Sequence, residues 1–477
     1  MPIIVYLGLA TIIILSIFLI RNKKSDSILS ITYLCLQWGF TIYEYFNLNN
    51  EQLEYFTPDA IGVILLFVLS TIATTSYYYS LIYFRHKVTP PKVRSIYFVA
   101  LFSLITSLAC AYLSNHIAIM WIFAELTTLS SAILIYHNRT HKSLEATWKY
   151  LFISSVSIAL IFIGILFLGI AAQEAKLDGL FFKTLLENAN LLDEFWLKSS
   201  FLLVFTGFTV KAGLVPMYTA GIDAKDKAPT PASALFSSVI MNLGFLGIFR
   251  LFEVVSNTSA YQWACTVLFI SAFLSIFVSA VYMIRVKNFK RMFAYSSIEH
   301  MGIIMLGMAS GGIGYYGAIL HLVLHSFTKS SLFYQTGTLV RVINSKLIKD
   351  GGEYFDKNTF GAIVLILSFF VVTAMPPSGL FVSEFLIFRS IFEANYIWLL
   401  IVIIALLSFI IWAMSENLFK LLFNKLPNSN NNKYEFEKIS SLETIPQLAL
   451  ILAVIYLGFY PPEFLQNLIL QALINLK

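Results

Sequence analysis

The stretch FTGFTVKAGLVPMYTAG, residues 205–221, places one charged side chain, Lys211, inside a long apolar run. Pro216 follows five residues later. A long apolar run is a candidate for a membrane span, where no water solvates a lysine or a broken backbone. The combination therefore predicts a helix that is interrupted inside a polytopic membrane protein, at a place where protein or water lines the gap.

The composition of the whole chain points to the same class of protein. Of its 477 residues, 58% are hydrophobic and 12% are charged, whereas soluble domains carry about 25% charged residues. Residues 1–20 are apolar without a basic start, so we expect a first span rather than a cleaved signal peptide. The three cysteines are dispersed in apolar runs and have no metal-binding spacing. We expect no catalytic centre, cofactor or metal in this chain.

Apolar runs predict about fourteen spans, at roughly 20 residues for each span. They cover residues 2–20, 27–46, 59–84, 95–114, 117–136, 150–172, 197–217, 230–255, 260–284, 292–310, 313–340, 359–392, 395–420 and 442–470. The eleventh and twelfth runs are too long for one straight helix, so we expect both to be interrupted. The prediction is an all-α polytopic membrane protein.

The charges of the connecting loops indicate an orientation. Basic segments follow odd-numbered spans: RNKK (21–24), RHKVTPPKVR (85–94), HNRTHK (137–142), DAKDK (223–227), RVKNFKR (285–291) and RVINSKLIK (341–349). Loops on the other side are nearly free of basic residues, and the 173–196 segment is mixed and net acidic. Because cytoplasmic loops are rich in Lys and Arg, we expect a bacterial inner-membrane protein with both termini outside. The net charge of +6 belongs largely to the cytoplasmic rim and needs no nucleic-acid partner.

Ionisable side chains at membrane depth are functional candidates because they are costly to bury. They are Glu125 in the fifth span, Lys211 in the seventh, Glu299 and His300 near the start of the tenth, His321, His325 and Lys329 in the eleventh, and Glu384 in the twelfth. The three residues of the eleventh span are four apart and share one helical face. Glu384 follows a second break, at Pro376 and Pro377.

The spacing of these charges indicates an internal repeat. Glu125 and Lys211 are 86 residues apart, and Glu299 and Glu384 are 85 residues apart. In each pair the second charge lies beside a proline break, as expected for interrupted helices in corresponding positions of two halves. A repeat unit of five spans crosses the membrane an odd number of times. The second copy therefore begins on the opposite side of the membrane and is inverted. The expected organisation is helices 1–3 (1–94), a first repeat (95–255), a second repeat (260–425), and a polar linker with helix 14 (426–477).

This pattern predicts a path for protons. A Lys211–Glu125 pair that forms and breaks would make the lysine alternately hold and release a proton. The histidine face would carry protons onward, since histidine titrates nearest to neutral pH, and Glu384 would be the exit. Structural alternatives stay open: Glu125 as a tie between two helices, Lys211 snorkelling from a helix end, and the histidines as satisfied core groups.

Five motifs resemble the antiporter-like, proton-translocating membrane subunits of respiratory complex I, Mrp antiporters and energy-converting hydrogenases. The motifs are TVKAGLVPMYT, APTPASALFSS, NFKRMFAYSSIEHMGIIMLG, GAILHLVLHSFTKSSLFY and PPSGLFVSEFLI. Within that family, WIFAELTTLSSAILIYH and SSIEHMGI look most similar to the hydrogenase-4 component F type. The resemblance implies fourteen helices with two inverted five-helix repeats and broken helices 7 and 12. It also implies proton-transfer roles for Glu125, Lys211, His321, His325 and Glu384.

The chain departs from the family pattern after helix 7. Where the family usually reads M-H-x-W-x-P-D-A-H, this chain has MYTAGIDAK, in which Asp223 remains and Lys225 replaces the final residue. Asn242 stands where complex I members usually carry a lysine, and it fits the hydrogenase-4 branch. We include Asp223 and Asn242 among the expected proton-transfer positions, although an asparagine conducts only with water and stores no charge.

Three functions follow from these observations. The first is a proton-translocating subunit of a membrane oxidoreductase complex, with electron transfer in a peripheral cytoplasmic partner because no redox motif occurs here. The second is a Mrp-type Na⁺/H⁺ antiporter subunit, or the membrane partner of a zinc-containing subunit in inorganic-carbon uptake. The third is a non-conducting scaffold. In each case the chain works with other membrane subunits.

Overall fold

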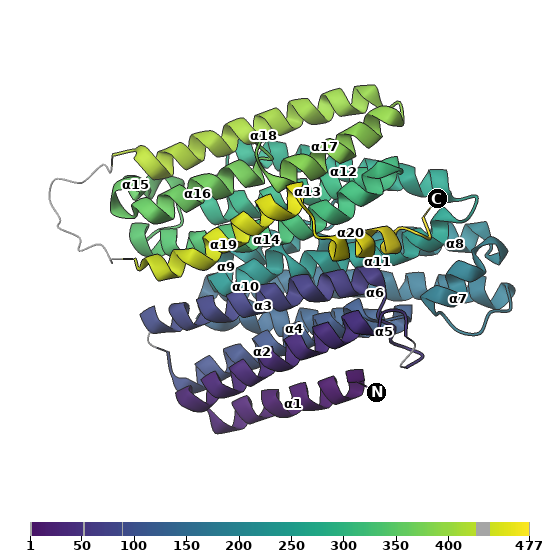
Figure 1. The fold of residues 1–477 in the computed structure, drawn as a ribbon, viewed down its shortest axis with the longest axis horizontal. Coiled ribbons are helices and arrows are strands. Elements are labelled where there is room, and N and C mark those ends of the chain that lie inside the picture. Colours follow the sequence, from purple (N-terminus) through teal and green to yellow (C-terminus); the bar gives the residue numbers. More distant parts are fainter. Residues whose placement is uncertain (1, 51–52, 88, 426–438, 477) are drawn as a thin grey trace. The chain divides into compact units, whose positions relative to one another are not determined.

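Helices carry nearly all of the chain in the computed structural model, which describes residues 2–50, 53–87, 89–425 and 439–476 (Figure 1). In that described part the only extended pairings are isolated bridges such as Leu53 with Phe56. The predicted all-α fold is confirmed. The predicted polar linker after residue 425 lies almost entirely outside the described residues.

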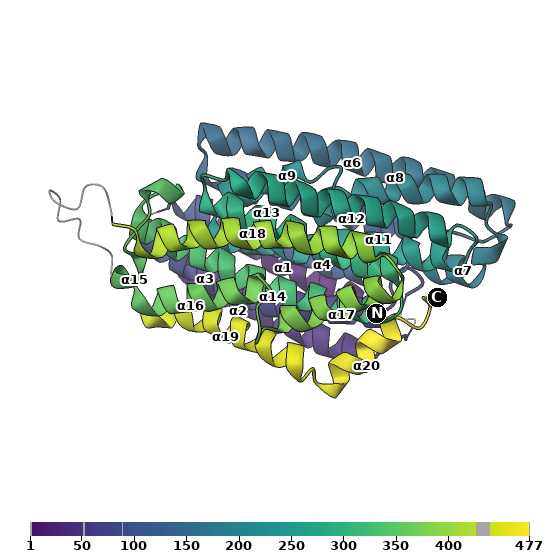
Figure 2. The same ribbon diagram turned by 90° about the horizontal axis from the view of Figure 1, so that it is seen from above.

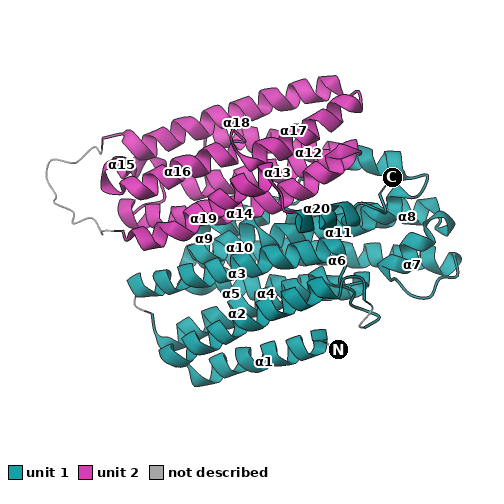
Figure 3. Cartoon of the chain, viewed as in Figure 1, with its two compact units in different colours: residues 1–268, 463–477 teal, residues 269–462 magenta. Residues whose placement is uncertain are grey.

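The helices group into two compact units (Figure 3). One unit comprises Met1–Leu268 and Glu463–Lys477, and the other comprises Phe269–Pro462. The first unit contains α1 Pro2–Ile20, α2 Lys23–Phe46, α3 Ala60–His86, α4 Pro91–Tyr112, α5 Ile117–Ile135, α6 His141–Glu174, α7 Phe182–Glu187, α8 Glu194–Ala212, α9 Thr219–Lys227, α10 Thr230–Ser237, α11 Val239–Ser256 and α20 Glu463–Ala472. α12, Tyr261–Ile284, begins in the first unit and continues into the second.

The second unit contains α13 Phe289–Ser310, α14 Ile313–Ile343, α15 Tyr354–Lys357, α16 Thr359–Val372, α17 Gly379–Glu393, α18 Ile397–Phe423 and α19 Ser441–Phe459. Grouping helices by contact does not test internal symmetry. The repeat boundaries at 95–255 and 260–425 therefore stay a prediction.

Burial separates the helices that line the interior from those that face outward. All residues of the apolar stretch within Thr230–Ser256 are buried. By contrast, 22% of the residues in the apolar stretch of α1 and 28% of those in the apolar stretch of α18 are buried. Large apolar side chains such as Trp398 are exposed on these outer helices. Outward apolar faces of this extent suit a hydrocarbon solvent.

Nine helical segments of the described residues are long and apolar enough to cross a membrane, and one of them, Thr230–Ser256, contains both α10 and α11. This number is lower than the predicted span count partly because some spans are divided. Helix 7 is divided into α8 and α9, and helix 12 is divided into α16 and α17. Both predicted breaks are therefore present, and each contains a cis peptide bond, at Val215–Pro216 and at Pro376–Pro377.

Three expectations about span continuity were wrong or incomplete. The eleventh span is one continuous helix, α14, of 31 residues, because no proline interrupts it. The eighth span is divided at Ser238 into α10 and α11, without a proline or glycine at the junction. The last span is two helices, α19 and α20, which belong to different compact units.

Candidate functional site

The break between α8 and α9 places Lys211 in the last turn of α8. Gly213 ends this helix in the left-handed conformation, with φ of 72°, which glycine adopts without steric cost. α11 packs directly against the end of α8, since a Cβ at Gly244 would lie 2.1 Å from the backbone nitrogen of Ala212. The C-terminal turn of a helix is the favourable end for a cation, so the break helps to hold a lysine in the interior.

Lys211 is only 3% exposed and is held by hydroxyl groups of α5. Its Nζ donates to Thr127 Oγ1 at 3.0 Å and to Thr128 Oγ1 at 2.7 Å. Both hydroxyls in turn donate to the carbonyl oxygen of Ala124. The ring of Tyr150, on α6, lies 5.8 Å from the amine. A buried cation needs such acceptors because it has lost its water.

The predicted Glu125–Lys211 pair is arranged through threonine rather than as a direct ion pair. Within the described residues the amine contacts hydroxyls, and Glu125 interacts with it electrostatically from farther away. Thr128, one turn along α5, lies beside the carboxylate as well as the amine. The Oε2 atom of Glu125 has no hydrogen-bond partner. A proton exchanged between these two groups would pass through a hydroxyl or through water.

The other predicted residues of this unit lie in different settings. Asn242 is fully buried in α11, one turn after the junction at Ser238. Asp223, on α9, is 3.9 Å from the exposed amine of Lys149 and so lies near the surface.

Lys225 is a site residue that the sequence reading missed, because it was assigned to a cytoplasmic loop. α9 folds this segment inward, so Lys225 is 3% exposed and its Nζ lies 3.1 Å from Met241 Sδ. Its replacement of a family histidine was the signal that would have identified it.

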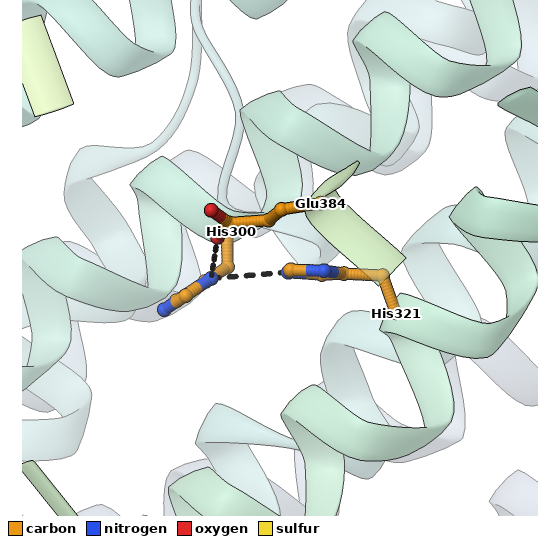
Figure 4. A group of neighbouring side chains, drawn as sticks. All are labelled: His300, His321 and Glu384. Atoms are coloured by element: carbon orange, nitrogen blue, oxygen red, sulfur yellow. Dashed lines mark hydrogen bonds and ion pairs between the residues drawn. The ribbon is translucent and has the colours of Figure 1, made fainter. Parts of the chain in front are cut away.

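The second unit contains the larger polar cluster, which is built on α13, α14 and α17 (Figure 4). His300 Nδ1 lies 3.0 Å from His321 Nε2 and 3.8 Å from Glu384 Oε1. The ring of His325 is 5.3 Å from the ring of His300. Because α13 begins at Phe289, His300 lies in the middle of that helix and not near its start. The structure therefore brings four of the predicted residues into one buried group.

The break between α16 and α17 positions the acidic side of this cluster. α17 begins at Gly379, where a Cβ would lie 2.1 Å from the carbonyl oxygen of Val454. This close approach of α17 to α19 places Ser383 and Glu384 beside α14. Ser383 Oγ lies 2.9 Å from His321 Nδ1, and sequence reasoning did not identify this serine.

Two arrangements of hydrogens satisfy the chain from Ser383 to His300. If Ser383 donates to the carbonyl of Leu380, at 3.0 Å, then His321 Nδ1–H donates to the serine and His321 Nε2 accepts from His300. If Ser383 donates to His321, then His321 Nε2–H donates to His300 instead. Neutral imidazole has one donor and one acceptor nitrogen, so converting the first arrangement into the second requires one proton to enter at His300 Nε2 and the serine's original proton to leave. The protons shared by His300, His321 and Ser383 each shift by one hydrogen bond in the same direction.

Lys329 and Glu299 repeat the lysine, hydroxyl and glutamate arrangement within the second unit. Lys329 Nζ donates to Ser296 Oγ at 2.5 Å. Ser296 is one turn before Glu299 on α13, and Glu299 Oε2 has no hydrogen-bond partner. Lys329 is fully buried and Glu299 is 5% exposed. Each unit thus holds a buried lysine beside a hydroxyl and near a carboxylate, which is buried for Glu299 and half-buried for Glu125.

Three side chains of this cluster carry atoms of the kind that bind metal ions. Ligand atoms of His300, His321 and Glu384 all lie within 4.8 Å of one another, and two imidazoles with a carboxylate suit Zn²⁺. The separation of 3.0 Å between the two ring nitrogens is the length of an N–H···N hydrogen bond. The contact between these two nitrogens is therefore satisfied as a hydrogen bond.

The sequence of this chain is similar to those of known membrane proteins. The family described as "NADH:quinone oxidoreductase/Mrp antiporter, TM" matches residues 114–411. The hydrogenase-4 component F homolog of Methylacidiphilum infernorum is 30% identical over 354 residues, which cover 72% of this chain and 74% of that protein. NADH-quinone oxidoreductase subunit M of Rickettsia prowazekii is 25% identical over 487 residues, which cover 97% and 95% of the two chains.

A solved structure supports the fold independently of close sequence identity. A chain of the membrane-bound sulfane sulfur reductase, an archaeal respiratory membrane complex, superposes with a TM-score of 0.83 at 19% identity. The superposition covers 99% of this chain and 97% of that one.

Proposed function

Because this chain belongs to the NADH:quinone oxidoreductase/Mrp antiporter membrane family, we propose that it moves protons, or another cation, across the membrane through its buried Glu, Lys and His side chains. The chain is an integral multi-pass membrane protein and an antiporter-like subunit, and relatives of this kind are components of larger complexes. The proposal adds that the movement is driven by a partner's reaction.

The observation that carries this proposal is the hydrogen-bonded chain Ser383–His321–His300 beside Glu384. It lies at a break in a helix, it is buried, and it has two hydrogen arrangements that interconvert when one proton enters at His300 and another leaves at Ser383. A purely structural polar cluster has no need for a chain of this kind, since apolar packing is as stable as a buried ionic network. Lys211 with Thr127 and Thr128 supports a second transfer point in the first unit.

We propose a redox partner, of the hydrogenase or complex I type, as the energy source. A relative that is 30% identical over 72% of this chain is a hydrogenase-4 component F homolog, and this chain has no redox motif of its own. A Mrp-type antiporter subunit and the membrane partner of a zinc-containing uptake subunit are the alternatives. We further propose a bacterial inner membrane as the location, with the basic loops in the cytoplasm.

The experiment compares two lysine variants in closed, inside-out membrane vesicles that contain the native assembly. Lys211→Met removes the buried amine, and Lys149→Met removes an amine whose side chain is 53% exposed. Because positioned proton-transfer groups contribute a factor of about 100 to 10,000, we expect Lys211→Met to lower the initial rate of proton movement by roughly tenfold or more. Lys149→Met should leave it unchanged. Equal rates in both variants and the wild type would support the scaffold alternative.

The partner is identified by purifying the assembly through a tag on this chain, followed by mass spectrometry. Iron–sulfur or nickel–iron subunits are the expected result. A single soluble zinc-containing partner without a redox centre, or a set of antiporter subunits, would overturn the redox assignment while leaving the ion-transfer proposal intact.

A further inference from the structure

Two buried glutamines of the second unit stand apart from the rest of its polar groups. Gln335 on α14 and Gln447 on α19 are both fully buried. Among the residues that the structure describes, neither the amide oxygen nor the amide nitrogen of either side chain has a hydrogen-bond partner. Buried amides are nearly always hydrogen-bonded because an unsatisfied one is costly, so four unsatisfied amide atoms in neighbouring helices require an explanation.

A third buried glutamine shows how this chain treats an amide that is structural. Gln37 on α2 is also fully buried. Its Oε1 accepts from Tyr6 at 2.5 Å, and its Nε2 donates to Ser70 at 3.1 Å. The fold thus satisfies a glutamine completely where it has only to hold helices together.

Gln447 lies on a polar contact between α14 and α19, which pack side by side (Figures 1 and 2), and Gln335 is one turn after Ser331, the α14 residue at that contact. Ser331 Oγ on α14 donates to the carbonyl oxygen of Gln447 at 3.0 Å. One turn before Gln447, Glu443 pairs with Arg341 at the end of α14 that leads into the basic segment 341–349. Beyond Gln447 the buried face of α19 is apolar and ends at Gly458. The polar residues of this contact therefore lie at its end nearer the basic segment.

The polar face continues along α14 toward the histidine cluster. Thr328 is seven residues before Gln335, and His321 is seven residues before Thr328. Residues seven apart lie on nearly the same face of a helix. Lys329 is the nearest titratable group of the cluster along the helix, at about 9 Å of axial rise from Gln335.

We propose that Gln335 and Gln447 line a water-filled path that joins the histidine cluster to the basic end of the second unit. Each amide offers two acceptor sites and two N–H donors, so the pair supplies the two to four polar partners that a buried water needs. The inference rests on the proposed function, because it assigns these residues a place in the movement of protons.

Proton transfer along this path leaves the number of protons in it unchanged. The glutamine side chains do not change their protonation. A proton that enters at the basic end is passed from water to water, and a different proton leaves the last water toward the cluster. The amides orient the waters and neither gain nor lose a proton. The cluster then releases one proton for each that it accepts, so the transfer is balanced in either direction.

The test compares three variants of the native assembly in closed vesicles. The double variant Gln335→Leu, Gln447→Leu replaces both amides by apolar groups of similar size. The double variant Gln335→Asn, Gln447→Asn keeps the amides and leaves room for water. Gln37→Leu is the matched control for the loss of a buried, fully bonded amide. Initial rates of proton movement and melting temperatures of the purified assembly are measured for each.

We expect the leucine double variant to lower the rate of proton movement by about tenfold without lowering the melting temperature. The asparagine double variant should retain most of the rate. Gln37→Leu should lower the melting temperature and leave the rate per folded assembly unchanged. A leucine double variant that moves protons at the wild-type rate, or an asparagine variant as slow as the leucine one, would overturn the path.

Lys211→Met separates this inference from the proposed function. If Lys211→Met abolishes proton movement while the leucine double variant is normal, the path is wrong and the function stands. If Lys211→Met is also normal, the proposed function itself fails.

Discussion

At the scale of single residues, Lys211 and Lys329 explain the positions of three hydroxyl residues, Thr127, Thr128 and Ser296. Each amine has given up its water and is held by hydroxyls that come from a neighbouring helix. A hydroxyl can accept from the charged lysine and still donate to a backbone carbonyl, as Thr127 does to Ala124. For Lys211, the partners of the amine among the described residues are hydroxyls rather than a carboxylate in a direct ion pair.

A first prediction concerns the threonines that hold Lys211. The double variant Thr127→Val, Thr128→Val keeps the shape of both side chains and removes both acceptors of the amine. We expect proton movement in vesicles to fall by about tenfold, since the lysine then lacks partners for its charged form. Thr147→Val on α6 is the control, because that hydroxyl bonds only to a carbonyl of its own helix. Equal rates in both variants would count against a transfer role for Lys211.

A second prediction concerns Ser383, which contacts His321 Nδ1. Ser383→Ala leaves a buried imidazole nitrogen without its partner, at a cost of about 1–3 kcal/mol, and removes one end of the Ser383–His321–His300 chain. We expect slower proton movement as well as lower stability. Ser390→Ala on the same helix also deletes a buried serine with partners of its own, and it should lower stability alone. If the two variants slow transport alike, the effect is one of folding.

At the scale of helices, close backbone contacts set where the polar groups lie. A Cβ at Gly458 would be 2.1 Å from the Cα of Gly379, the first residue of α17. We expect Gly458→Ala to push α19 from α17, to destabilise the fold by about 1–3 kcal/mol as overpacking does, and to displace Ser383 and Glu384. Gly169→Ala, where nothing lies within 4 Å of the added atom, should be neutral or slightly stabilising. Thermal unfolding and proton movement of both variants check this.

The sequence predicted the helices and two of their breaks, because proline interrupts a helix for a local reason. Pro216 and Pro376 mark those positions unambiguously. The junction at Ser238 has no such residue, so the packing around α11 decides it. α14 stays continuous although it is long and polar, since no proline interrupts it and His321 and Lys329 have partners on other helices. Contacts between distant segments are not visible in a local pattern.

In the candidate site too, some residues are visible in the sequence, and others are identified only by contacts between distant segments. Charged residues at membrane depth stand out in an apolar sequence, which is how Glu125, Lys211 and Glu384 were found. Thr127, Ser296 and Ser383 were not found, because hydroxyl residues are common in spans and only their position against a lysine or histidine gives them a role. Lys225 was missed because α9 turns inward after the break.

At the scale of the whole molecule, the loop charges predict which ends face the cytoplasm. Lys287 and Asp178 are both exposed, in a basic loop and in the net acidic segment. In a Cys35→Ser background, Asp178→Cys should react with a membrane-impermeant maleimide in intact cells. Lys287→Cys should react only after the cells are opened. The opposite pattern would reverse the orientation and, with it, the side to which the Gln335 path leads.

The most direct test of the central claim is the number of protons moved per turnover of the partner's reaction in closed vesicles. It is measured for the wild-type assembly and for His321→Asn, which removes the middle of the Ser383–His321–His300 chain. We predict that the partner's reaction continues while the ratio falls well below that of the wild type. An unchanged ratio at an unchanged rate of reaction would show that protons do not pass through this chain's buried groups.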